Sequence, residues 1–146
     1  MYMIWQLITS FIASAGFGII FNAPKRTLFQ CGLGGMLGWV IYLVLDPYYD
    51  TVISTVAATF VVGVISQVSA RIYRMPVIVF SVAGIIPLVP GGLAYDAMRK
   101  FVENDYNTAV QLAAQAFLIS GSIAIGLVVS EVLNQLLIRK RKPHRG

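Results

Sequence analysis

Two prolines and three glycines fall in one short window of a long apolar run, from Gly84 to Gly92 (Gly-Ile-Ile-Pro-Leu-Val-Pro-Gly-Gly). A proline inside a helix removes one hydrogen bond and clashes with the carbonyl four residues earlier. Pro87 would release the carbonyl of Ala83 in this way. Pro90 would release that of Ile86. Lipid cannot satisfy such groups, so broken backbone survives at membrane depth only inside protein or beside a watery cavity. Because broken helices recur where transporters bind their cargo, the segment predicts a binding site. The alternative is a kinked structural helix, since proline and glycine are common in membrane helices.

The residues that follow the break predict a short amphipathic helix. Between residues 93 and 103, apolar side chains recur on one face and charged side chains fill the other. The first amides of that helix, including those of Gly91 and Gly92, would point into the break and favour an anion. Tyr95, one turn further along, would add a hydroxyl. With the released carbonyls as acceptors for an ammonium group, the break would suit an amino acid. The alternative is an interfacial helix that binds nothing.

A polar stripe runs along the apolar segment from Thr51 to Ala70. Thr55, Thr59 and Ser66 share one face of a helix, at about 100° per residue. One interpretation is a polar wall of a substrate path. The other is close helix packing, with each hydroxyl bonded to the preceding turn of its own helix.

Glu131 is the one acidic residue inside an apolar run, and it lies roughly 12 Å along the helix before Arg139. A charge at depth is costly and usually faces the bundle interior or a cavity. One hypothesis makes this carboxylate the proton-coupling group. The other makes it the ion-pair partner of Arg71 or Arg74.

The composition places these residues in a membrane protein. Hydrophobic residues make up 58% of the chain and charged residues 12%, with a mean hydropathy of +0.77. A soluble domain carries roughly twice that charge. We predict an all-α integral membrane protein with about five transmembrane helices, the fourth broken at the Pro-x-x-Pro-Gly-Gly segment. The expected spans are Ile4–Phe21, 24–45, Thr51–Ala70, a run that begins at Pro76 and contains the break, and Thr108–Ile138.

Small residues four apart predict close packing between these helices, because they let two backbones approach. Such spacing occurs in Ser10-x-x-x-Ser14-x-x-x-Gly18, Gly34-x-x-x-Gly38 and Ser122-x-x-x-Gly126-x-x-x-Ser130.

The loop charges favour one orientation, with the N-terminus outside and the C-terminus in the cytoplasm. The sequence thus predicts one transmembrane domain, 1–138, and a basic cytoplasmic tail, 139–146, that touches anionic lipid headgroups. The net charge of +5 therefore indicates topology signals rather than nucleic-acid binding. The inner side would carry Lys25, Arg26, Arg71, Arg74 and the tail, and the outer side Asp46, Asp50 and a mixed loop from Asp96 to Asp105.

Few other residues offer chemistry. Cys31 is the only cysteine, the lone His144 lies in the basic tail, and no metal cluster or cofactor motif is expected. The sequence has no P-loop lysine motif, no HExxH and no Ser/His pair at depth, so we predict that the chain is not an enzyme. The first residues lack the positive region of a cleavable signal peptide.

Two segments, Gly16–Arg26 and Gly84–Tyr95, resemble the signature segments of the threonine/serine exporter (ThrE) family. The resemblance covers essentially the whole chain and points to the small, five-helix (YjjB-like) subunit of the split form. It implies a multi-pass protein of the bacterial inner membrane. It also implies a hetero-oligomer with a larger five-span subunit that has a soluble N-terminal domain. A second half that follows an odd number of spans must enter the membrane inverted, which agrees with the loop charges.

We therefore expect the small membrane subunit of a two-component, secondary active exporter of small carboxylate-bearing metabolites. The cargo would be a threonine/serine-type amino acid or a dicarboxylate such as succinate. The alternative is a non-transporting assembly subunit that stabilises its larger partner. The resemblance assigns no residue roles, so the candidates rest on chemistry. Those for substrate binding are Asn22, Arg26, Ala83, Gly84, Ile86, Pro87, Pro90, Gly91, Gly92 and Tyr95.

Overall fold

A computed structural model describes residues 1–141, with the side chain of Arg141 left out. Within that range the chain is helical and contains no strand. Of the basic tail, Arg139 and Lys140 continue the last helix, whereas His144 and the other residues of 142–146 lie outside the described part. The elements are α1 (Tyr2–Ile20), α2 (Lys25–Leu45), α3 (Thr51–Tyr73), α4 (Val77–Ile85), the 3-10 turn η1 (Ile86–Leu88), α5 (Gly91–Val102) and α6 (Tyr106–Arg141).

Three helices end in the same way, on a non-glycine residue with left-handed backbone geometry. Asn22, Arg74 and Asn104 have φ angles of 57°, 53° and 63°. In each case the next amide donates to the carbonyl five residues earlier, over 2.9 Å to Gly18, 3.0 Å to Ala70 and 3.0 Å to Lys100. These bonds satisfy carbonyls that a helix end leaves without partners, and they reverse the chain between neighbouring helices.

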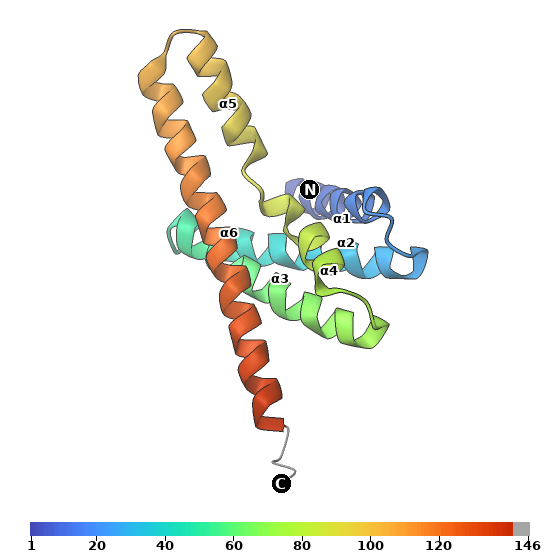
Figure 1. Cartoon of the computed structure of the whole chain (residues 1–146). Helices are drawn as coiled ribbons and strands as arrows, with labels where there is room; N and C mark the ends of the chain where they lie inside the picture. Colours follow the sequence, from blue (N-terminus) through green and yellow to red (C-terminus); the bar gives the residue numbers. More distant parts are fainter. Residues whose placement is uncertain (142–146) are drawn as a thin grey trace.

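The helices form two groups (Figure 1). α1 to α4 pack on one another, with α1, α2 and α3 running in alternating directions, while α5 and α6 form a steep hairpin that extends beyond them. α6 crosses α3, and this is the most extensive contact between two elements. The bend between α4 and α5 therefore joins the two groups.

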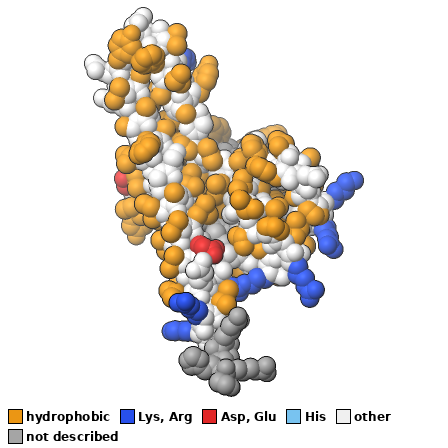
Figure 2. All heavy atoms as spheres, viewed as in Figure 1, with side chains coloured by type: hydrophobic (Ala, Val, Ile, Leu, Met, Phe, Trp, Pro, Cys, Tyr) orange, Lys and Arg blue, Asp and Glu red, His pale blue; other side chains and the backbone are white. Residues whose placement is uncertain are grey.

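The structure confirms an all-α membrane protein with a broken fourth helix. Among residues 1–141, four helices, α1, α2, α3 and α6, are long and apolar enough to cross a membrane. Up to five spans result if α4 with η1 and α5 count as one, and this pair is bent by 53°. Apolar side chains cover much of the face seen in Figure 2. This exposure is expected of a surface that contacts lipid or another membrane subunit.

Val62 on α3 fills the centre of the first group of helices. It is fully buried, and it leaves no room for a side chain on either of two facing glycines. A Cβ on Gly38 of α2 would lie 2.5 Å from Val62 Cγ2, and a Cβ on Gly84 of α4 would lie 2.6 Å from Val62 Cγ1. α2, α3 and α4 therefore meet at Val62, and the packing alone requires a glycine at position 84.

The small-residue motif of α6 packs against α3 through two reciprocal contacts. A Cβ on Gly126 of α6 would lie 1.9 Å from Thr59 Oγ1 of α3, and a Cβ on Gly63 of α3 would lie 2.0 Å from Ser130 Oγ of α6. At each level a glycine on one helix receives a hydroxyl from the other. The predicted close approach of backbones through small residues is confirmed here.

The basic helix ends gather along one edge of the molecule, which bears on orientation. Figure 2 shows Lys and Arg side chains at the right edge and the lower end, where Figure 1 places the α1–α2 turn, the α3–α4 turn and the end of α6.

We expect a cysteine at Tyr48 to react with an impermeant thiol reagent added outside cells, and a cysteine at Lys140 not to react. Both are exposed. Cys31, which is 1% exposed, would first be replaced by alanine. Labelling of the Lys140 position alone would contradict the N-out orientation.

Candidate functional site at the helix break

The break lies between the end of α4 at Ile85 and the start of α5 at Gly91. η1 closes with a bond from the Val89 amide to the Ile86 carbonyl, 3.3 Å long. Val89 is extended, and the Gly91 amide then donates to the Val89 carbonyl over 2.8 Å. The expectation that the Ile86 carbonyl and the Gly91 amide would be free for a ligand is therefore wrong. The tight turn made possible by the prolines uses both groups internally.

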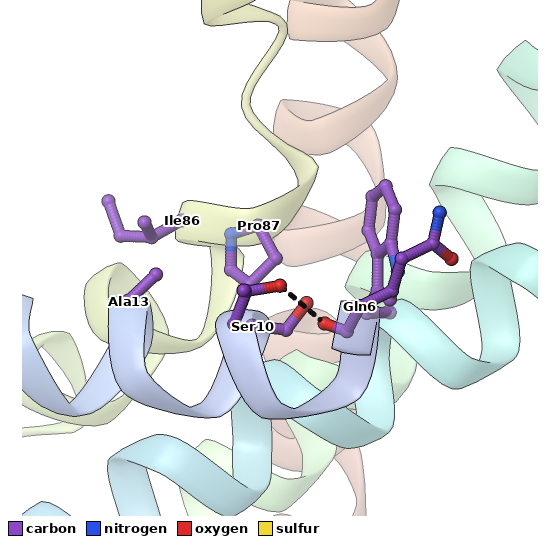
Figure 3. A pocket seen from close by; sticks show the side chains of 7 residues that line it. Gln6, Ser10, Ala13, Ile86 and Pro87 are labelled. Carbon is purple, nitrogen blue, oxygen red and sulfur yellow. Dashed lines mark hydrogen bonds between the residues drawn. The ribbon is translucent and has the colours of Figure 1, made fainter. Parts of the chain in front are cut away.

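A first cavity, of about 230 Å³, lies on one side of the break between α1 and η1. Figure 3 shows Gln6, Ser10 and Ala13 on one turn after another of α1, facing Ile86 and Pro87. Thr9 and Trp39 complete the lining, and the Thr9 hydroxyl donates to the Gln6 carbonyl over 3.0 Å. Polar groups on an otherwise apolar helix face thus point at the break.

A second cavity, of about 220 Å³, lies on the other side of the same proline. It shares Trp39 and Pro87 with the first and is lined further by Tyr42, Thr55, Leu88, Val89, Pro90, Gly92, Leu93 and Ile119. A third cavity, of about 390 Å³, adjoins it through Tyr42, Leu93 and Ile119 and reaches Asp50, Thr51 and Gln115. The three cavities form a series from the polar face of α1, past the break, to the acidic turn between α2 and α3.

The structure brings together only part of the predicted substrate site. Pro87, Pro90 and Gly92 line the second cavity, and Ile86 joins Pro87 in the first. No Cβ at Gly91 or Gly92 would meet another atom, so the start of α5 is open. Ala83 and Gly84 are buried by packing, and Tyr95 is 67% exposed. Asn22 and Arg26 lie at the α1–α2 turn, roughly 13 Å along α1 from Ala13, and line neither cavity.

Several lining residues were not predicted from the sequence. Gln6, Thr9 and Ser10 follow the helical spacing of one face in an apolar run, and that pattern could have revealed them. Trp39 and Tyr42 had no such signal, because an aromatic pair one turn apart is ordinary in a membrane helix. Their rings stack with centroids 5.2 Å apart.

The polar stripe of α3 is mostly a packing surface. Thr55 donates to the Thr51 carbonyl over 2.7 Å, Thr59 to the Thr55 carbonyl over 2.8 Å, and Ser66 to the Val62 carbonyl over 2.7 Å. All three donors are buried. These are the bonds to the preceding turn that the packing interpretation requires. Thr55 alone of the three also lines the second cavity.

Glu131 accepts hydrogen bonds from two amides. Gln67 Nε2 of α3 donates to Glu131 Oε2 over 3.0 Å, and Gln135 Nε2 of α6 donates to Glu131 Oε1 over 3.1 Å. Arg71 is bonded to Asn134 instead. Among residues 1–141, the ion pairs within 4.0 Å involve only Asp96, Arg99, Lys100 and Glu103. The expected pairing of Glu131 with Arg71 or Arg74 is therefore absent, and a neutral amide network surrounds a carboxylate on an exposed face of α6.

No group of three or more His, Cys, Asp or Glu side chains in the described residues could hold a metal ion. Neither of the cavities at the break is lined by a charged side chain from residues 1–141. The arrangement offers hydroxyl, amide and indole groups around a broken helix, and these groups can bind a polar solute but provide no nucleophile with a base.

The sequence around the helix break belongs to a known protein family. The family model described as "Threonine/Serine exporter, ThrE" matches residues 6–133. The chain belongs to the threonine/serine exporter (ThrE) family. The description of that family is of exporters, and this agrees with the long apolar helices of the structure. The resemblance of Gly16–Arg26 and Gly84–Tyr95 to family segments is thereby confirmed.

The ThrE-family chain is also similar to a longer protein. An uncharacterized protein of Haemophilus influenzae (strain ATCC 51907 / DSM 11121 / KW20 / Rd) is 28% identical over 146 residues, which cover 97% of this chain and 49% of that protein. The chain thus spans about half the length of this relative. No solved structure matches the chain described here.

Proposed function

We propose that the chain is the small membrane subunit of a two-component, secondary active exporter of small carboxylate-bearing metabolites. The observation that carries the proposal is the pair of cavities that meet at Pro87, where a broken helix lies inside a ThrE-family chain. Broken helices expose backbone dipoles to a solute at the middle of a transporter. The cargo is an amino acid of the threonine/serine type or a dicarboxylate such as succinate.

The chemistry of the lining supports a small polar cargo. In the first cavity, Gln6, Thr9 and Ser10 offer hydrogen bonds, and in the second, Tyr42 and Thr55 do so. Gly92 at the start of α5 lines the second cavity, and a helix N-terminus there favours a carboxylate because it carries partial positive charge. Neutral donors of this kind bind a zwitterion without trapping it.

The resemblance to the small subunit of the split form supports a second component. We infer that a larger five-span subunit with a soluble N-terminal domain assembles with this chain. The assembled protein would reside in a bacterial inner membrane, with the N-terminus of the small subunit outside.

Reconstitution in liposomes tests this function. We expect the small and larger subunits together to transport labelled serine, threonine or succinate, and either subunit alone to transport none. Transport by the small subunit alone would overturn the two-component proposal. The alternative is a non-transporting assembly subunit. It would be favoured if the larger subunit transports equally well without this chain but is obtained in lower yield.

We expect the proton to be the driving ion, with Glu131 as its carrier, and this makes a separate prediction. Glu131→Gln should abolish gradient-driven flux but leave solute exchange intact. Because glutamine can still bond to Gln67 and Gln135, the free energy of unfolding should change by less than about 1 kcal/mol. Flux, exchange and thermal unfolding would be measured together.

Glu103→Gln is the matched control, since Glu103 is an exposed acid outside the α6 network. It should leave all three measurements unchanged. A Glu131→Gln variant that keeps gradient-driven flux, or one that loses stability and exchange together, would show that Glu131 is structural.

A further inference from the structure

We propose that the Trp39 side chain is a movable partition between the first and second cavities, and that its indole N–H donates a hydrogen bond to the cargo when the partition opens. The inference rests on the proposed transport function and adds to it a residue that selects and admits the solute.

The position of Trp39 supports the first half of the proposal. Trp39 and Pro87 are the two residues shared by the linings of both cavities. Pro87 is fixed by the backbone of η1 and lies against α2, where a Cβ on Gly35 would be 3.3 Å from the Pro87 ring. Trp39 is attached through two rotatable side-chain bonds. Of the two residues that separate the cavities, the tryptophan is the one that can turn aside.

The indole nitrogen supports the second half. Trp39 Nε1 is buried, and no acceptor among the described residues lies within hydrogen-bonding distance. A buried donor without a partner raises the free energy of the state that contains it. The closed arrangement therefore carries a penalty that a different ring position, with the N–H donating to a carboxylate of the cargo, would remove.

The neighbouring ring opposes this movement. Tyr42 stacks on Trp39 with an interplanar angle of 27°, and its hydroxyl lies beside Asp46 and Thr51. Stacking of this kind holds the indole in the closed position. Turning the indole breaks the stack but gives the N–H a partner, so the two effects are opposed. A solute that accepts the hydrogen bond would shift the balance toward the open position.

Trp39→Phe separates this role from a structural one. Phenylalanine keeps a ring against Tyr42 and removes the unsatisfied donor, so the closed state becomes more stable relative to the open one. In the reconstituted complex, we expect flux to fall roughly ten-fold, which corresponds to about 1.4 kcal/mol. The unfolding temperature should stay equal or rise. Trp5→Phe is the matched control, because Trp5 is 64% exposed on α1 and lines neither cavity. It should change nothing.

Fluorescence gives a second measurement that does not depend on flux. The chain has two tryptophans, so the difference between the Trp5→Phe complex and the Trp5→Phe/Trp39→Phe complex isolates the emission of Trp39. We expect acrylamide to quench this emission weakly in buffer and more strongly when serine, threonine or succinate, whichever the wild type transports, is saturating.

The outcomes separate the two proposals. Suppose that the wild-type complex transports its solute. If the Trp39→Phe complex then keeps its flux within two-fold of wild type, or if acrylamide quenching does not respond to solute, the proposed role of Trp39 is wrong and the proposed transport function is unaffected. Loss of both flux and thermal stability in Trp39→Phe would also overturn the partition, because that is the result of a packing residue. If the wild-type complex transports none of the three solutes, the proposed cargo is wrong, and so is the proposed role of Trp39, which depends on it.

Discussion

Replacing both prolines of the break by alanine should leave the protein folded and inserted but abolish transport. Alanine has the highest helix propensity and supplies the amides that Pro87 and Pro90 lack, so α4 and α5 would tend toward one continuous helix. The 53° bend would be lost, and with it the Pro87 ring that lines two cavities. We expect flux at least about 100-fold below wild type, the loss that a displacement of binding groups by about 1 Å causes in enzymes.

Flux in liposomes at equal protein content, together with helical content by circular dichroism, would check this. Pro90→Ala alone is the milder variant, since η1 and the Pro87 ring would remain. Pro24→Ala is the matched control, because Pro24 is exposed at the start of α2 and far along the chain from the break. Flux close to wild type in the double variant would mean that the break is structural and that cargo binds elsewhere.

Gly126→Val should prevent the protein from folding stably, because α6 could no longer approach α3. A Cβ at this position would lie 1.9 Å from Thr59 Oγ1 and 2.8 Å from the Val56 carbonyl oxygen, and the second atom belongs to the backbone and cannot turn away. Overpacking of a tight interface costs about 3 kcal/mol, and valine adds two further methyl groups. The yield of monodisperse protein and its unfolding temperature should both fall sharply.

Gly121→Val is the matched control on the same helix, since no atom lies within 4 Å of the position of its Cβ. That variant should be purified normally. Equal yields from the two variants would show that the α3–α6 contact is not needed for the fold.

Local sequence signals predicted the elements well. Apolar runs gave the helices, Pro24 and Pro76 marked two starts, and the Pro-Gly segment marked the break that the structure has between Ile85 and Gly91. Each of these signals acts within one or two turns of chain. The signals could not say which groups would be used inside the turn, so the Ile86 carbonyl and the Gly91 amide were wrongly expected to be free.

Contacts between distant helices were harder to predict. Loop charges put Arg71 and Glu131 on the same side of the membrane, and opposite charges suggested a pair. The register of the α3–α6 crossing decides otherwise, because it places Gln67 opposite Glu131 and Asn134 opposite Arg71. The role of Gly84 was hidden for the same reason, since its partner Val62 comes from another helix.

The paired glycines and hydroxyls between α3 and α6 limit how this protein can change shape. Gly63 with Ser130 and Gly126 with Thr59 interlock at two levels, so α6 cannot slide along α3 without lifting away from it at both. The two helices should therefore move as one rigid body. Relative motion is left to the joint between η1 and α5, which consists of the extended Val89 and of Pro90. The proposed function would then rely on bending at this joint rather than on sliding between α3 and α6.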